Sequence, residues 1–109
     1  MNYIGAIVKI LEKPKQKFLN SNTLVLTFRA ELPQVRKNRI VKLVILGNLA
    51  RVVLSYYKIN DYILIEGYVS IRENITSKLN KKLFKKVTIT VVKIYPFLLN
   101  YNQSINKLF

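Results

Sequence analysis

A single change of hydrophobic period constrains the fold of this 109-residue chain more than any other feature. Apolar residues fall at Leu49, Val52, Val53 and Tyr56, which is the i, i+3, i+4, i+7 spacing of one helix face. The segments on both sides are instead rich in β-branched and aromatic residues, as strands are. The sequence therefore predicts one short helix, Asn48–Tyr57, in an otherwise all-β chain, with Tyr56 on the face that packs into the core.

Five segments have the composition of strands, and prolines or Asn-rich turns separate them. Pro14, Pro33 and Pro96 follow the first, second and fifth segments, where we expect them to end the strands. Gly67 lies inside the fourth segment, which predicts a bend or a close approach of two backbones. The predicted strands are Tyr3–Leu11, Thr23–Leu32, Arg39–Leu46, Tyr62–Glu73 and Phe84–Tyr95.

The order of these elements, with the helix between the third and fourth strands, favours one architecture. A five-stranded OB-fold barrel is built in this way. We therefore predict an all-β OB-fold domain over residues 1–96 and a short C-terminal tail over residues 97–109. The alternative is another small barrel or an α+β sheet. Because the first strand is apolar on both faces, we also expect its outer face to be covered by another sheet or subunit.

The missing residue types exclude most enzyme chemistry. The chain has no His, Cys or Trp, so ordinary zinc, copper and haem sites, cysteine nucleophiles and Ser-His-Asp triads are excluded. The carboxylates are scattered, and the three glycines form no phosphate-binding loop. We expect a protein that is not an enzyme and uses no cofactor or metal. The apolar stretch Ile4–Leu11 contains Lys9 and is shorter than the ~20 residues of a membrane span, so we expect no membrane contact.

A net charge of +14 predicts a polyanionic partner such as nucleic acid, an acidic membrane surface or an acidic protein. The alternative is codon bias in an AT-rich genome, which raises the Lys, Asn and Ile content. The positions of the charges favour binding, because they concentrate in the loops and strands that form the ligand face of an OB-fold. The candidate nucleic-acid-binding residues are Lys15, Lys17, Arg36, Lys37, Arg39, Lys42, Arg72, Lys78, Lys81, Lys82, Lys85 and Lys86.

Proteins that bind single strands also use aromatic side chains on which bases stack. Tyr68 on the outer face of the fourth strand, Phe84 beside the last hairpin and Tyr62 are the candidates for this role. A packing role is the alternative for each of them.

Residues 41–69, VKLVILGNLARVVLSYYKINDYILIEGYV, carry a family resemblance. Their G-N-L-A and I-E-G motifs resemble the core of bacterial-type single-stranded DNA-binding proteins, at the spacing of that family. The chain is most similar to hypothetical plastid open reading frames of algae that are described as single-stranded DNA-binding proteins. The resemblance implies an OB-fold homo-oligomer that protects or organises single-stranded DNA in replication or repair, and the doubly apolar first strand indicates association through that strand. It also implies a plastid location, in the stroma or nucleoid, with the bacterial cytoplasm as the alternative.

The chain departs from the family pattern in two ways. Ile40, Leu46 and Asn74 occupy the positions where the family places stacking aromatics, and no acidic residue follows Glu73. We therefore expect binding mainly through Lys and Arg contacts to phosphates, and no acidic tail that recruits partner proteins. Two alternatives remain: an OB-fold module that binds RNA or a replication partner, or a barrel whose nucleic-acid surface has decayed.

Overall fold

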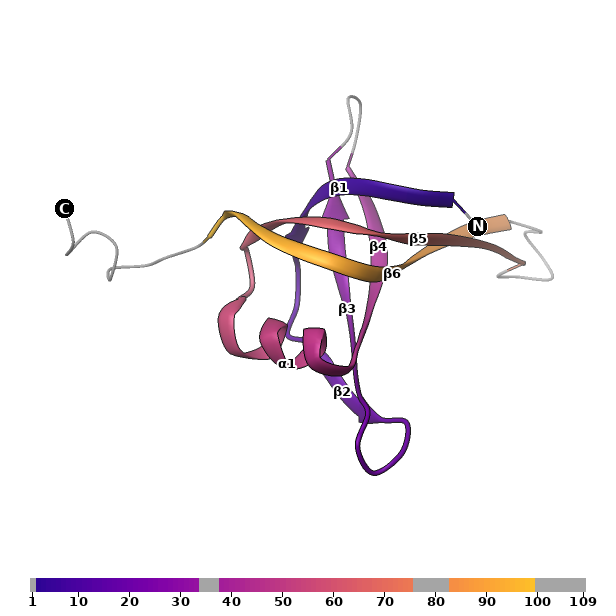
Figure 1. Cartoon of the computed structure of the whole chain (residues 1–109). Helices are drawn as coiled ribbons and strands as arrows, with labels where there is room; N and C mark the ends of the chain where they lie inside the picture. Colours follow the sequence, from indigo (N-terminus) through magenta and orange to yellow (C-terminus); the bar gives the residue numbers. More distant parts are fainter. Residues whose placement is uncertain (1, 34–37, 76–82, 100–109) are drawn as a thin grey trace.

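The computed structural model describes residues 2–33, 38–75 and 83–99 (Figure 1). Within these residues the chain forms six strands and one helix. In chain order they are β1 (Asn2–Ile10), β2 (Lys15–Phe18), β3 (Leu24–Leu32), β4 (Arg39–Leu46), α1 (Gly47–Tyr56), β5 (Tyr62–Ile75) and β6 (Leu83–Leu98).

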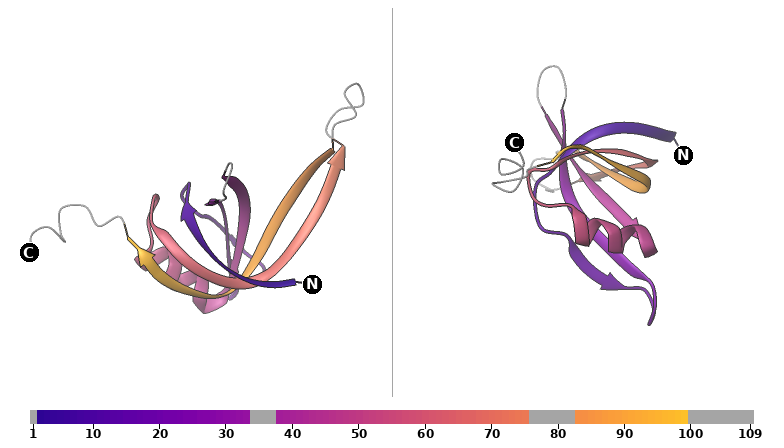
Figure 2. Two further views of the ribbon diagram at one scale, coloured as in Figure 1. Left: turned by 90° about the horizontal axis from the view of Figure 1, so that it is seen from above. Right: turned by 60° about the vertical axis from the view of Figure 1, so that its left-hand side comes forward.

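The strands form one sheet in the order β1-β5-β6-β4-β3-β2. A further pairing of β1 with β3, at Lys9–Glu31 and Ile10–Ala30, closes this sheet into a barrel. The barrel and its single helix beside β4 confirm the predicted OB-fold, and Figure 2 shows the curvature of the sheet in two further views.

The strand β2 was not predicted, because K-Q-K-F has no apolar alternation and the sequence indicated a loop there. It pairs with β3, from Lys15–Thr27 to Phe18–Leu24. Since β1 also reaches β3 at its last two residues, β1 and β2 together form the first strand of the barrel, interrupted around Pro14. The five-stranded description therefore holds with its first strand in two parts.

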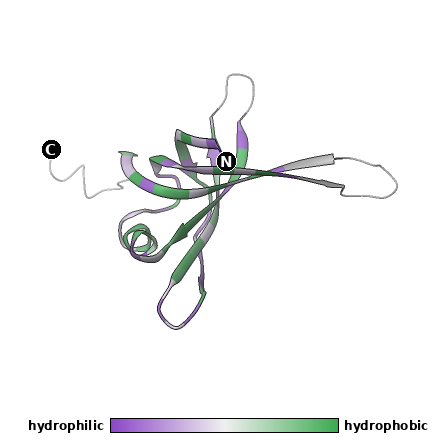
Figure 3. Ribbon diagram, turned by 45° about the vertical axis from the view of Figure 1, so that its right-hand side comes forward, coloured by the Kyte–Doolittle hydropathy of each residue, from purple (hydrophilic) through white to green (hydrophobic). Residues whose placement is uncertain are grey.

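Strict alternation along the strands fills the core of the barrel. Val41, Leu43 and Ile45 share one face of β4 and are fully buried, and so are Ile63 and Ile65 of β5. Figure 3 shows hydrophobic residues concentrated along the barrel strands. Ile71 shares the face of Ile63 on β5 but is 58% exposed, because β5 and β6 continue beyond the barrel as a two-stranded ribbon.

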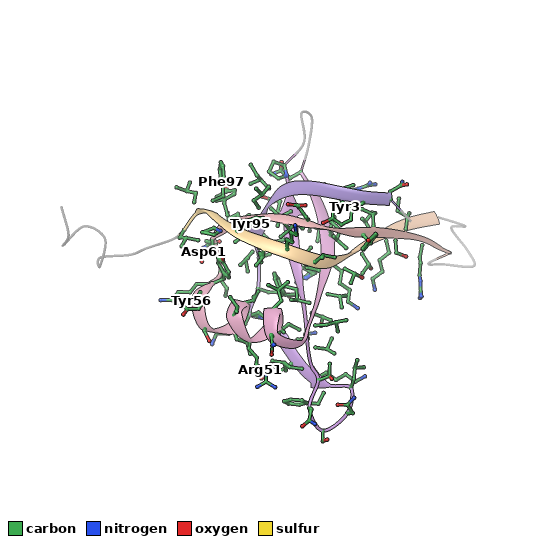
Figure 4. The ribbon with its side chains drawn as sticks, in the orientation of Figure 1. Tyr3, Arg51, Tyr56, Asp61, Tyr95 and Phe97 are labelled. Atoms are coloured by element: carbon green, nitrogen blue, oxygen red, sulfur yellow. The ribbon has the colours of Figure 1, made fainter. Side chains whose placement is uncertain are left out.

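The prediction for Tyr56 is wrong. Its side chain is 71% exposed and lies on the outer side of α1 (Figure 4), whereas Ala50 and Val53 are fully buried and Tyr57 packs partly against the core. The buried stripe of the helix therefore follows the i, i+3, i+7 positions that begin at Ala50. The small Ala50 side chain allows the helix backbone to lie close to the sheet, and this rotates Val52 and Tyr56 toward solvent.

Gly67 makes the predicted close approach. A Cβ atom at this position would lie 2.2 Å from the carbonyl oxygen of Thr90 on the neighbouring strand β6. The β5–β6 register shifts between Glu66 and Gly67, which marks a β-bulge. Only a residue without a side chain fits this contact.

The prediction that Pro96 ends the last strand is also wrong, since β6 continues to Leu98. Pro96 pairs with Ile63, next to a second register shift between Tyr62 and Ile63. An irregularity in the ladder tolerates a residue without an N–H donor, so the strand passes through the proline.

Candidate nucleic-acid interface

Cationic side chains of four chain segments share the outer face of the sheet, opposite the core. Arg29 of β3 pairs with Lys42 of β4, and Lys42 pairs with Thr88 of β6. Residues paired across strands project to the same face, as do residues two apart on one strand. Lys15 pairs with Thr27, two positions before Arg29, and therefore joins this face from β2.

These side chains line a depression of about 390 Å³ on the barrel surface. We call it the basic hollow, and the residues that line it are Glu12, Lys15, Thr27, Phe28, Arg29, Lys42 and Lys86. Three of its four cations, Lys15, Lys42 and Lys86, are residues that the sequence predicted for nucleic-acid binding. The structure thus brings together positions that lie far apart along the chain.

Arg29 was missed by the sequence analysis, and Glu12 holds it in place. The backbone N–H of Arg29 donates to Glu12 Oε2 at 2.8 Å, and its Nε donates to Glu12 Oε1 at 3.2 Å. The guanidinium also forms an ion pair with this carboxylate, with 3.1 Å between Arg29 Nη2 and Glu12 Oε1. On β3, Thr27 and Arg29 alternate with buried apolar residues and therefore point outward. This alternation was the signal that could have identified Arg29.

The same contacts lower the pKa of the Glu12 carboxyl below its ordinary value. The hydrogen bond from the Arg29 backbone is the largest cause, and partial burial acts in the opposite direction. The Arg29 side-chain hydrogen bond, and then the charges of Arg29 and Lys15, lower the pKa further. Glu12 is therefore a carboxylate at neutral pH and neutralises part of the positive charge of the basic hollow.

The other predicted cations have different positions. Arg72 pairs with Lys86 across β5 and β6 and extends the basic face along the ribbon, and Lys17 follows Lys15 on the same face of β2. Arg39 is exposed, but it shares the face of Val41 on β4 and therefore points to the side opposite Lys42. Lys85 lies on β6, but its side chain is outside the described part. Arg36, Lys37, Lys78, Lys81 and Lys82 lie outside the described residues.

Tyr68 is the aromatic candidate that lies on the outer face. Its ring is 44% exposed and packs edge-on against the ring of Tyr3, with 5.0 Å between centroids. A continuous series of cross-strand pairs joins it to the basic hollow, in the order Tyr68, Thr90, Val44, Thr27 and Lys15. At a strand separation of about 4.8 Å, this cross-strand row is about 19 Å long.

The hydroxyl of Tyr3 donates to Glu66 Oε1 at 3.1 Å. Desolvation is the largest cause that raises the pKa of this phenol, followed by the hydrogen bond to Glu66 and its charge. Tyr3 was not among the predicted residues, and it supports the ring of Tyr68 from β1.

The remaining aromatic candidates do not join this row. Tyr62 is partly buried at the start of β5, where Lys9 Nζ lies 6.0 Å from its ring centroid. Phe84 lies on β6, but its side chain is outside the described part. In the described residues, no group of three or more acidic side chains gathers into a possible metal site. Among the described residues, no helix is long and apolar enough to cross a bilayer.

The closed barrel and its basic outer face define an OB-fold domain. No protein-family model matches the chain. Its sequence is 42% identical over 107 residues to the "Putative single-stranded DNA-binding protein ycf41" of Trieres chinensis, with 94% of this chain and 95% of that protein covered. The chain therefore belongs to the ycf41 family.

Solved structures of low sequence identity share the fold. The small single-stranded DNA-binding protein of Streptomyces coelicolor superposes with a TM-score of 0.68 at 14% identity, over 90% of this chain and 97% of that one. The SSB domain of a Synechococcus protein gives 0.65 at 22% identity, over 87% and 94% of the two chains. The mitochondrial protein Rim1 of S. cerevisiae gives 0.67 at 7% identity, over 91% and 97%.

Proposed function

We propose that this chain binds single-stranded DNA across the outer face of β2, β3, β4 and β6, and so protects or organises single strands in replication or repair. The observation that carries the proposal is the basic hollow, where Lys15, Arg29, Lys42 and Lys86 converge on one depression. Cations held this close together are stabilised by an anion that they share. Phosphate groups at regular intervals along a strand meet this requirement.

The cross-strand row supports a single strand as the ligand. It offers a surface that leads from the cations to an exposed aromatic ring, and base stacking requires unpaired bases. Ile40 and Leu46, which stand at family stacking positions, are exposed aliphatic side chains on β4. Stacking is therefore limited, and phosphate contacts supply most of the affinity. The name of the Trieres relative supports the same ligand.

We propose a homo-oligomer that associates through β1. Among the described strands, residues 2–8 of β1 pair only with β5, so their other edge is available to a second copy. The exposed ring of Tyr3 on the outer face of β1 adds an apolar contact for this association. A plastid location, in the stroma or nucleoid, is supported by the algal source of the relative. The proposed function is the binding of single-stranded DNA and includes no catalysed reaction.

Fluorescence anisotropy with dT oligomers, rU oligomers and duplex DNA, over a salt series, tests this function. We expect dT to bind most tightly and log K to fall with log salt by about 0.7 for each phosphate neutralised. The double variant Lys42→Ala/Lys86→Ala should bind dT at least about tenfold more weakly, because two charge-assisted contacts are lost. The matched control is Arg51→Ala/Lys58→Ala, which removes the same charge from exposed positions on α1 and just after it, outside the basic hollow.

Absence of binding at low salt would refute the proposal, as would equal affinity for duplex or an equal loss in the control. Tighter binding of rU would instead identify an RNA-binding module. Size-exclusion chromatography with light scattering tests the oligomer, and a strict monomer at micromolar concentration would refute it.

A further inference from the structure

A second depression, of about 520 Å³, lies on the other side of β2, between the helix and the connection from β1 to β2. We call it the apolar hollow. Its walls are Ile10, Pro14, Val53, Leu54, Tyr57 and Ile59, and Lys13 and Lys58 stand at the same depression. Both lysines are exposed, and no acidic residue of the described part lines it.

The segment 58–61, which supplies Lys58 and Ile59 to the apolar hollow, is held in a defined shape. The N–H of Asn60 donates to Ile10 O at 2.8 Å, and the N–H of Ile10 donates to Asp61 O at 2.9 Å. The buried carboxylate of Asp61 accepts the backbone N–H of Lys58 at 2.7 Å. These bonds tie the segment after α1 to β1, so the apolar hollow exists before any ligand arrives.

The apolar hollow and the basic hollow lie on opposite faces of β2. Gln16 lines the first and Lys15 lines the second, and neighbouring residues of a strand point to opposite faces. A ligand can therefore occupy either surface without displacing a ligand from the other. Phe18, two residues after Gln16, is exposed on the same face and extends the apolar surface.

We propose that the apolar hollow binds a partner protein through an acidic peptide segment with one or two large apolar side chains. Apolar walls favour apolar side chains, and the two lysines favour carboxylates beside them. A second copy of this chain is a poor occupant, because its five carboxylates are scattered along the sequence and form no acidic segment. A nucleic acid is a poor occupant as well, because it places a phosphate at every unit and would leave these apolar walls uncovered.

A fluorescein-labelled peptide, acetyl-Asp-Asp-Leu-Phe-Asp-Asp-amide, is the probe, and the full chain is the receptor. At physiological ionic strength, where the Debye length is about 8 Å, long-range attraction to the basic chain is largely screened. We expect replacement of Leu-Phe by Ala-Ala to weaken binding about tenfold, because the apolar contact is lost. A peptide with Lys in place of Asp should not bind measurably.

Two glutamate variants of α1 separate the apolar hollow from general charge. Leu54 lines it and is 37% exposed, while Val52 is 41% exposed on the same helix and does not line it. Leu54→Glu should weaken the peptide about tenfold, whereas Val52→Glu should change it by less than about twofold. Thermal unfolding of both variants controls for folding, and dT affinity should be equal in the two.

Three outcomes would overturn the proposal. The first is equal binding of the Ala-Ala and Leu-Phe peptides, which would mean that charge alone is recognised. The two glutamate variants would weaken the peptide equally if it bound elsewhere. Saturating dT would displace the peptide if both used the basic hollow. A failure of dT binding with the peptide results intact would refute only the function proposed above.

Discussion

Glu12 binds Arg29 through both its backbone and its side chain, with 2.8 Å from the Arg29 N to Glu12 Oε2 and 3.1 Å from Nη2 to Oε1. The carboxylate therefore competes with any phosphate for this guanidinium. It also fixes the position of Arg29 at the basic hollow. Glu12 thus limits the affinity of the site while it organises the site.

The variant Glu12→Gln should bind dT oligomers about threefold more tightly, because it removes a competing negative charge. The salt slope should become steeper by about 0.7, the contribution of one further phosphate contact. Anisotropy over a salt series measures both quantities. Glu31→Gln is the control, since Glu31 lies on β3 two residues from Arg29 but does not line the basic hollow. The same gain in both variants would contradict a specific role for Glu12.

The lowered pKa of Glu12 predicts how stability depends on pH. The folded-state pKa lies below the ordinary value of 4.5, so the ionised form is favoured by folding. This stabilisation is present above the unfolded pKa and is lost as the pH falls through the folded pKa. The melting temperature of the wild type should exceed that of Glu12→Gln at neutral pH, and the difference should shrink as the pH falls below 4.5 and disappear below the lowered folded-state pKa. A difference that persists in strong acid would exclude Glu12 ionisation as its cause.

Gly67→Ala should destabilise the barrel by about 2 kcal/mol or more, because the new Cβ meets the backbone of β6. Gly5→Ala is the matched control on the neighbouring strand β1. Its Cβ would lie 3.8 Å from the nearest atoms, which is an ordinary contact, so we expect a change within about 1 kcal/mol. Urea unfolding of both variants measures the difference. Equal stabilities would mean that the β5–β6 contact relaxes without cost.

Tyr68→Ala should weaken dT binding by about 1–3 kcal/mol if one base stacks on its ring. Tyr95→Ala is the control, because Tyr95 is also 44% exposed but lies outside the cross-strand row. Tyr62→Ala should have little effect, since Lys9 already covers that ring. An unchanged affinity of Tyr68→Ala would assign Tyr68 to packing against Tyr3 alone.

Local sequence patterns predicted the parts of the fold that depend on alternation. The bounds of β4 were predicted without error, because its run of apolar and β-branched residues needs no distant information. Tyr56 was misplaced because α1 has two adjacent apolar stripes, and the contact with the barrel selects between them. The strand β2 exists only through its pairing with β3, so its own residues carried no signal.

The same distinction applies to the site. Lys15, Lys42 and Lys86 were predicted from their segments, but their common depression depends on barrel closure and strand register. Arg29 was overlooked because a single charge within an apolar strand is inconspicuous in the sequence. Glu12 gave no signal at all, because its partner Arg29 lies 17 residues away, on β3.

The short strand β2 separates two surfaces of different chemistry. Lys15 lines the basic hollow and Gln16 lines the apolar hollow, and Lys17 and Phe18 follow them on the same two faces. The turn between Leu19 and Thr23 sets this assignment, through the hydrogen bond from Leu19 N to Thr23 O. The loss or gain of one residue in that turn would slip the register and exchange the two faces. The length of a surface turn, usually the most variable feature of a fold, is therefore a trait under constraint in this chain.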